Sequence, residues 1–243
     1  MRSDRWEVEA NPERGGRITS LRLDGEELLD QGIGVDQPTA DGFVEGGAWG
    51  WDEMVPNVER TESLPDHGEA WRLKWQVMRA AGIELAMRCR GRILPWELSR
   101  SVYLRDSVMV LYTYRNIGRQ PHPAYWCAHP LFKFEPGMSI SLVEGERLAG
   151  LAEGTSTKLH LPRGSTDHVR LGWSSGTAIE VRWDPEKTPY VGVWACNGDL
   201  GGYRQIAIEP ATGGGDRPTA AMPAPMLGPG AQLSWALEVR PVT

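Results

Sequence analysis

The stretch QLSWALEVRP (Gln232 to Pro241) shows the pattern that decides the fold class of this chain. Every second residue in it is apolar: Leu233, Trp235, Leu237 and Val239. A period of two is typical of a strand with one face buried. The same period recurs in ELAMRCRGRIL (Glu84 to Leu94) and in AIEVRW (Ala178 to Trp183). The sequence therefore predicts a protein built from half-buried strands.

Turn signals separate these strands and set the architecture. RITSLRLDGEELL (Arg17 to Leu29) places Asp24-Gly25 between alternating segments, a pair suited to a type I′ hairpin turn. RSVYLRDSVMVLYTYRNIG (Arg100 to Gly118) reads as two strands joined near Asp106-Ser107. No stretch of 12 or more residues keeps a helical period, because 29 Gly and 18 Pro interrupt the chain. We expect an all-β, large antiparallel sandwich or barrel in a single domain, residues 1–243.

Composition excludes several function classes. A net charge of −6 and a pI near 5.5 argue against nucleic acid or an anionic membrane as partner. Three cysteines without CxxC spacing argue against a disulfide framework or a zinc knuckle. Met1 to Trp6 has no apolar region, and no segment approaches 18 apolar residues, so we expect a cytoplasmic protein. Eleven Trp against three Phe suit a sugar ligand, although core packing explains most of them.

Motifs for nucleotides, nucleophilic serines and metals are absent. There is no GxxxxGK[ST], GxSxG or HExxH, and the spacing of His122, Cys127 and His129 matches no common metal site. We therefore expect no metal and no cofactor. What remains is three polar clusters with apolar neighbours: GAWGWDEMVPNVE with Asp52 and Glu53, LPDHGEAWRLKW with His67, and AYWCAHPLFKFEPG with His129.

Two of the candidate residues share a local context. His129 precedes Pro130 and Glu209 precedes Pro210, which holds both backbones extended. Both also stand among apolar residues. Desolvation raises the pKa of a carboxyl group and lowers that of an imidazole, so two such groups facing one another suit proton transfer.

In this order the polar clusters resemble the aldose 1-epimerase, or galactose mutarotase-like, superfamily. Six matching segments span the chain in family order: GGRITSL (15–21), GWDEMVP (50–56), DHGEAW (66–71), WCAHPLF (126–132), IEPATG (208–213) and LGPGAQLSW (227–235). The resemblance implies one large antiparallel β-sandwich with a sugar cleft on one sheet, and chemistry that needs no cofactor.

The resemblance also assigns roles to residues. It implies that Glu209 takes the proton of the anomeric hydroxyl while His129 protonates the ring oxygen. It makes His67 the second cleft histidine, which binds sugar oxygens. Further substrate contacts are expected from Trp51, Asp52, Glu53 and Trp126.

One departure bears on the substrate. Relatives that act on hexose 6-phosphates carry HGFAR where this chain has His67-Gly68-Glu69-Ala70-Trp71, so the missing arginine argues against a phosphorylated substrate. For the sugar-binding aspartate of the family, Asp167 and Asp184 are the candidates.

The leading hypothesis is an isomerase that interconverts the anomers of a free or oligomeric aldose, acting as a monomer or homodimer on a small-molecule sugar. The alternative is a non-catalytic sugar-binding β-sandwich. A third reading, a relative of polysaccharide lyases or glycoside hydrolases, requires a second catalytic carboxylate from Asp52 or Glu53. For the first two we expect the Glu209 and His129 side chains across one pocket, about one sugar ring apart.

Overall fold

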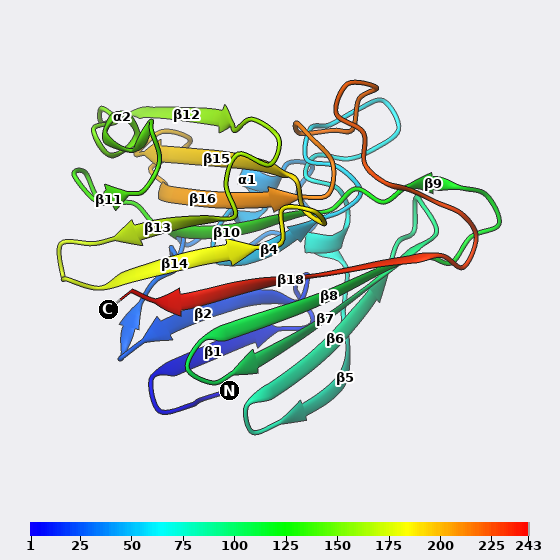
Figure 1. Cartoon of the computed structure of the whole chain (residues 1–243), viewed down its shortest axis with the longest axis horizontal. Coiled ribbons are helices and arrows are strands. Elements are labelled where there is room, and N and C mark those ends of the chain that lie inside the picture. The colour runs from blue at the N-terminus through cyan, green and yellow to red at the C-terminus, as the bar shows by residue number, and fades with distance from the viewer. Residues whose placement is uncertain (243) are drawn as a thin grey trace.

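The computed structural model describes residues 1–242, which form two large antiparallel sheets packed face to face (Figure 1). In spatial order, the first sheet consists of β1 (Trp6–Asn11), β2 (Arg17–Leu23), β4 (Trp51–Met54), β10 (Cys127–Lys133), β16 (Arg204–Ala211), β15 (Tyr190–Asn197) and β12 (Thr155–His160), with β3 (Glu26–Glu27) paired to β2. The second consists of β11 (Ser139–Ile140), β13 (His168–Gly172), β14 (Ala178–Trp183), β18 (Gln232–Pro241), β8 (Val108–Asn116), β7 (Trp96–Leu104), β6 (Glu84–Arg90) and β5 (Gln76–Ala81).

Short elements complete the fold. β9 (His122–Pro123) and β17 (Met226–Leu227) form a separate pair. The helices are α1 (Phe43–Gly47), α2 (Gly145–Ala149) and the single 3₁₀ turn η1 (Ala70–Arg72). Within residues 1–242, no helix has both the length and the apolar character needed to cross a membrane.

The strands predicted from the period of two are confirmed. β18 covers QLSWALEVRP and buries Trp235, Leu237 and Val239 on one face. Asp24 and Gly25 link β2 to β3 with φ of 52° and 87°, as a type I′ turn requires. The all-β sandwich is therefore confirmed, and the frequent glycines and prolines explain why the helices stay short.

The first sheet is covered on both faces. Its inner face packs on the second sheet in one apolar core, which includes Ile206 and Ile208 of β16. Alternate residues of the same strand, Ala207 and Ala211, join a smaller apolar cluster on the outer face. We call this outer face the cleft face.

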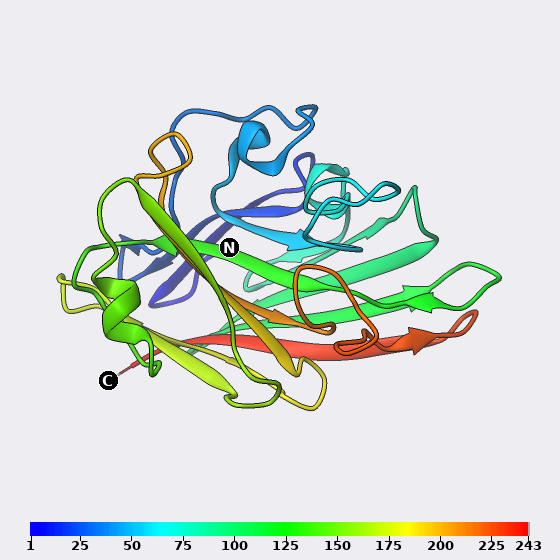
Figure 2. The ribbon, with the colours of Figure 1, turned by 90° about the horizontal axis from the view of Figure 1, so that it is seen from above.

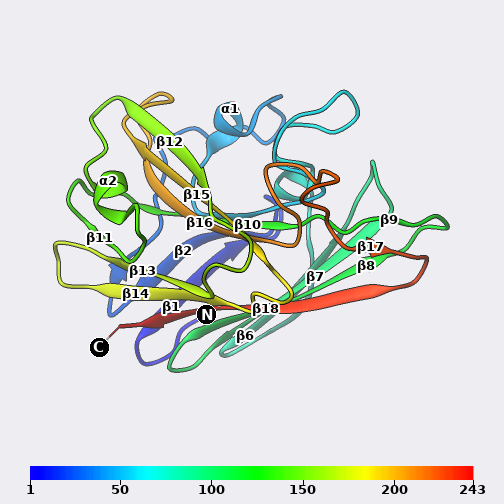
Figure 3. The same cartoon turned by 45° about the horizontal axis from the view of Figure 1, so that its top comes forward.

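Three segments lie over the cleft face. Figure 3 shows α1 and the loop of residues 55–69 on the side of the first sheet away from β14 and β18. The loop of residues 212–225 joins them, since the Val58 amide donates to the Asp216 carbonyl oxygen at 2.7 Å. Figure 2 shows the same segments from above. The arrangement leaves a recess between the sheet and its covering loops.

Candidate active site

His129 and Glu209 are neighbours on the cleft face. β10 and β16 pair as Cys127↔Ala211 and Leu131↔Ala207, and the same register places His129 opposite Glu209. Opposite residues of an antiparallel pair project to the same face with their Cβ atoms close together. The His129 Nε2 atom lies 3.7 Å from Glu209 Oε1, and both side chains are almost fully buried. The expectation of one sugar ring between them is wrong, because the two groups lie side by side on the cleft face of the sheet.

The imidazole of His129 opens into a cleft of about 500 Å³. Besides His129, residues of five segments line it, among them Phe43, His67, Lys158, Trp194, Tyr203 and Asp216. Its size falls in the range of small-molecule sites, and its lining combines aromatic surface with a few charged groups. This composition suits a polar ligand with apolar faces.

His67 reaches the same cleft from a constrained loop. Its φ is 56°, a left-handed conformation that is rare outside glycine, and Gly68 follows with φ 67°. A Cβ at Gly68 would lie 2.2 Å from the Val55 carbonyl oxygen, so the motif requires glycine there. The ring centroids of His67 and His129 are 5.4 Å apart, and Phe43 stacks on His67 at 4.5 Å. The second histidine therefore lies beside the first, as the resemblance implied.

Burial lowers the pKa of His129 well below its ordinary value, and the charges of His67 and Lys158 lower it further. The Nδ1 atom of His129 has no hydrogen-bond partner in the protein. On β4, Asp52 is its cross-strand neighbour. The resting imidazole is consequently neutral around pH 7.

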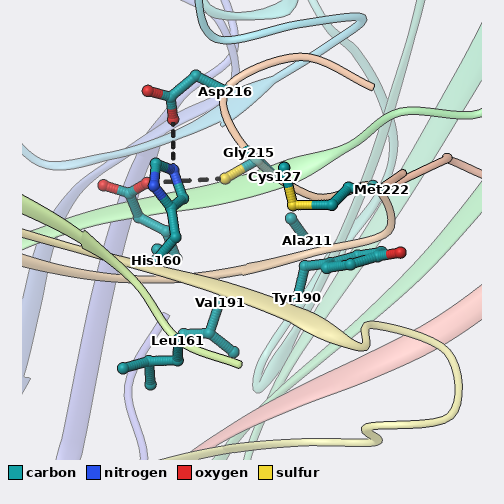
Figure 4. Close-up of a pocket in the computed structure, with 12 residues that line it drawn as sticks. Cys127, His160, Leu161, Tyr190, Val191, Ala211, Gly215, Asp216 and Met222 are labelled. Carbon is teal, nitrogen blue, oxygen red and sulfur yellow. Dashed lines mark hydrogen bonds and ion pairs between the residues drawn. The ribbon is translucent and has the colours of Figure 1, made fainter. Parts of the chain in front are cut away.

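Glu209 divides its two oxygens between different surroundings. Lys158 Nζ donates to Oε2 at 2.5 Å, whereas Oε1 has no hydrogen-bond partner in the protein and faces His129. A cavity of about 20 Å³, large enough for roughly one water molecule, adjoins the carboxylate. Figure 4 shows Cys127, His160 and Asp216 at one side of this cavity, and Tyr190 and Met222 at the other.

Sequence reasoning missed Lys158 and Asp216. Lys158 Nζ lies 3.2 Å from Asp216 Oδ1, so the ammonium bridges two carboxylates. Burial alone lowers the pKa of Lys158, but Glu209 and Asp216 outweigh it and the net pKa is raised. Burial likewise raises the pKa of Asp216, but the hydrogen bond from His160 and the charge of Lys158 outweigh it, and the net pKa is lowered. Both groups are charged at neutral pH.

Four predicted substrate contacts are misplaced. The side chains of Trp51, Glu53 and Trp126 point into the core between the sheets and are fully buried. Glu53 accepts hydrogen bonds there from Arg100 Nη1 at 2.9 Å, Tyr112 OH at 2.8 Å and Trp126 Nε1 at 2.7 Å. These contacts make the cluster part of the framework beneath the site.

Asp52 points to the cleft face, but it is fully buried and does not line the cleft. Arg17 Nε donates to Asp52 Oδ2 at 2.9 Å, and the guanidinium also donates to the Gly47 carbonyl oxygen at 2.8 Å. Burial raises the pKa of Asp52, and the charge of Arg17 opposes this. The pair anchors α1 to the sheet.

Neither candidate for a sugar-binding aspartate lies in the cleft. Asp167 contacts His168 and Arg182, and Asp184 accepts from the amide of Glu186. The carboxylates that line the cleft are instead Glu59, Asp66 and Asp216. Among residues 1–242, no group of three or more His, Cys, Asp or Glu side chains is placed to hold a metal ion.

Most of the tryptophans are buried in the protein, and one of them lines the cleft. Nine of the eleven are buried, which confirms core packing as their main use. Trp194 on β15 is partly exposed and lines the cleft. It is therefore the indole available to a ligand there.

Solved structures of other proteins share this fold over nearly the whole chain. A Slr1438 protein from Synechocystis sp. superposes with a TM-score of 0.77 at 16% identity, covering 98% of this chain and 95% of the other. A candidate aldose 1-epimerase from Escherichia coli gives 0.76 at 17%, covering 98% and 96%. A galactose mutarotase-like protein from Lactobacillus casei gives 0.74 at 14%, covering 100% and 99%.

The chain has the galactose mutarotase-like fold. No protein-family model matches the sequence, and no curated protein matches it. At such low identities the likeness concerns the backbone alone. The chemistry of this protein therefore has to be inferred from the residues of its own cleft.

Proposed function

We propose that the protein is an aldose 1-epimerase, an isomerase that interconverts the α and β anomers of an aldose by acid–base catalysis. The observation that carries this proposal is the 3.7 Å separation of His129 Nε2 and Glu209 Oε1 on the cleft face, where His129 lines the cleft and Glu209 lines the small cavity next to it. The two oxygens that exchange protons in anomerisation, the anomeric hydroxyl and the ring oxygen, are bonded to the same carbon. A base and an acid that are close neighbours can therefore reach both oxygens of one bound sugar.

The proton transfers close into a cycle. The cycle begins from the form of the enzyme in which His129 carries the imidazolium. Glu209 Oε1 accepts the proton of the anomeric hydroxyl while the His129 imidazolium gives its Nε2 proton to the ring oxygen, and the bond from C1 to the ring oxygen breaks. The open-chain aldehyde then rotates about C1–C2. On closure, the sugar hydroxyl attacks the other face of the carbonyl, His129 recovers its proton, and Glu209 returns its own to the anomeric oxygen. Both residues end in their starting states.

His67 and Trp194 are placed to contact other parts of a bound sugar. His67 lies against the imidazole of His129 and presents its ring to the cleft, where it would hold a sugar hydroxyl. Trp194 offers an indole surface for the apolar face of the ring. His129 lines the same cleft, and Glu209 lies next to His129.

The charges of the cleft favour a neutral sugar. Its cations, Arg60 and Lys158, share the cleft with three carboxylates, and Lys158 is already paired with Glu209 and Asp216. Glu69, which stands in the motif variant HGEAW, accepts from the amides of Arg92 and Ile93 and does not line the cleft. The residues that line the cleft do not form the cluster of cations that a phosphate group would favour.

A second candidate is sugar binding without catalysis. The contact of 2.5 Å between Lys158 and Glu209 favours it, because the ammonium already occupies Oε2 and leaves only Oε1 of the carboxylate to accept a proton. The two candidates predict the same binding and differ in whether anomers exchange.

The deciding experiment is NMR exchange spectroscopy on α-glucose, α-galactose and other aldoses with purified protein. Glu209→Gln and His129→Gln should each lose about two or more orders of magnitude in rate. Glu238→Gln, the same chemical change on β18 of the other sheet, is the matched control and should keep the full rate. Binding without acceleration over buffer would support the second candidate, and a Glu209→Gln variant at the wild-type rate would reject the first.

A further inference from the structure

One of the residues that line the cleft, Lys158, is a lysine that lies outside all of the matching sequence segments. Lys158 stands on β12, the outermost strand of the first sheet, yet its side chain is only 21% exposed. An edge-strand lysine ordinarily extends into water. Here the ammonium turns inward and contacts both Glu209 and Asp216.

A glycine leaves the space that the Lys158 side chain crosses to reach Glu209. Glu209 is opposite Gly192 on β15, while Lys158 is opposite Trp194, two residues further along the same strand. A Cβ at Gly192 would lie 2.8 Å from Glu209 Oε2 and 3.1 Å from Lys158 Cε. Any larger residue at position 192 would occupy the space through which the lysine crosses to the carboxylate.

The contact makes the two carboxylate oxygens of Glu209 different. Oε2 accepts from Lys158, and Oε1 is left without a protein partner at 3.7 Å from His129 Nε2. An ammonium carries three N–H donors, and Lys158 directs donors to Glu209 and Asp216. The carboxylate is thereby held from its far side with its free oxygen toward the histidine.

We propose that Lys158 is the positioning residue of the base: it holds Glu209 through Oε2 and presents Oε1 to the anomeric hydroxyl. This inference rests on the proposed epimerase function. The amine itself does not attack the open-chain aldehyde, because the two carboxylates keep it protonated and a protonated amine has no free electron pair.

Several charged or titratable groups surround the pair and enter any pH measurement. His129 and Cys127 face Glu209 from β10, and Asp216 approaches Lys158 from the loop of residues 212–225. Behind these first neighbours, His67 adjoins His129, and His160 lies 3.4 Å from Asp216. Removal of the ammonium at position 158 also changes the charge that acts on His129 and Asp216, so the variant is compared with a charge-conserving one at the same position.

The test compares Lys158→Met, which removes the charge at similar length, with Lys158→Arg, which keeps it. For Lys158→Met we expect kcat to fall at least about tenfold with little change in KM. We also expect the acid limb of the kcat/KM profile to move about one pH unit or more upward, since an opposite charge at this distance has that effect. Lys158→Arg should keep the acid limb in place. Ser156→Ala, on the same strand face and bonded to Asp199, is the control and should change neither.

A second measurement needs no variant of Lys158. The ¹⁵N resonance of its ammonium, followed in the wild type and in Glu209→Gln, should shift and exchange faster with water when the carboxylate charge is removed. This measurement still tests the pair if the wild type exchanges no anomers, a result that would count against the proposed function alone. Lys158→Met with the wild-type rate and acid limb, or an ammonium resonance identical in both proteins, would overturn the inference.

Discussion

Glu209 Oε1 lies 3.7 Å from His129 Nε2 because two adjacent strands of the first sheet place these residues opposite one another. Each is followed by a proline, which keeps its backbone extended and removes one amide from the ladder between the strands. The relationship joins a carboxylate and an imidazole without any intervening group. It is the geometric basis of the proposed proton transfers.

The pH dependence of the reaction should reveal the burial of His129. Its pKa is lowered well below the ordinary value of 6.5, so only a small fraction of the free enzyme carries the imidazolium at neutral pH. Since kcat/KM reports the free enzyme, we expect it to rise as the pH falls below 7 and the protonated fraction of His129 grows. Rates measured by NMR from pH 4 to 9, corrected for the buffer reaction, test this. A maximum on the alkaline side would contradict the role of His129 as acid.

The burial of His129 should also make the stability of the protein depend on pH. The folded state disfavours protonated His129, whereas the unfolded chain protonates near pH 6.5. The free energy of unfolding that comes from the neutral imidazole is therefore complete above pH 6.5. It is lost as the pH falls toward the lowered pKa, by about 1.4 kcal/mol per pH unit. Urea unfolding at pH 7 and pH 5 should show a smaller loss in His129→Gln than in the wild type. Equal losses would show that another group dominates this pH range.

Gly192→Ala should damage the site without unfolding the protein. The added Cβ would press on Glu209 Oε2 and Lys158 Cε, which are ends of side chains and can yield. We expect kcat to fall about tenfold or more, as displacement of a catalytic group does, with stability changed by less than about 1 kcal/mol. Gly172→Ala on β13 is the matched control, because its Cβ would meet only ordinary contacts at 3.4 Å and 3.6 Å. Full activity in Gly192→Ala would show that the lysine can reach the carboxylate by another path.

The sequence predicted the sheets for a physical reason. A period of two is visible wherever one strand face is buried and the other is not, as in β18. β4 has no such contrast, because all four of its residues are buried. Adjacent residues of this strand point to opposite faces, so Asp52 faces the cleft side while Trp51 and Glu53 enter the core. The motif GWDEMVP therefore could not show which of its residues face the cleft and which face the core.

Lys158 was missed for a related reason. In TSTKLH a lysine on an alternating strand is typical of a solvated edge position, and nothing local distinguishes this one. Its inward turn depends on the register that places Gly192 beside Glu209, which is set by the pairing of β12 with β15 and of β15 with β16. Such information appears only when the sheet is assembled.

Glu53→Gln should destabilise the framework beneath the site. The change leaves the guanidinium of Arg100 fully buried without its counter-charge, which typically costs about 3–5 kcal/mol. Urea unfolding measures this loss, and Arg100→Met in the same background should restore part of it by removing the unpaired charge. Glu238→Gln should stay within about 0.5 kcal/mol of the wild type. A loss below about 1 kcal/mol in Glu53→Gln would show that the pair contributes little.

Trp194 should contribute to sugar affinity and leave the chemistry unchanged. It is partly exposed, lines the cleft and stands opposite Lys158 on the neighbouring strand. For Trp194→Ala we expect KM to rise roughly three- to tenfold with kcat nearly unchanged, the usual weight of an aromatic contact of about 0.5–1.5 kcal/mol. Trp194→Phe should retain most of the affinity, since it keeps an aromatic ring. Sugar should also change the tryptophan fluorescence of the wild type more than that of Trp194→Phe, because the other tryptophans are buried or lie outside the cleft. An unchanged KM in Trp194→Ala would place the sugar elsewhere in the cleft.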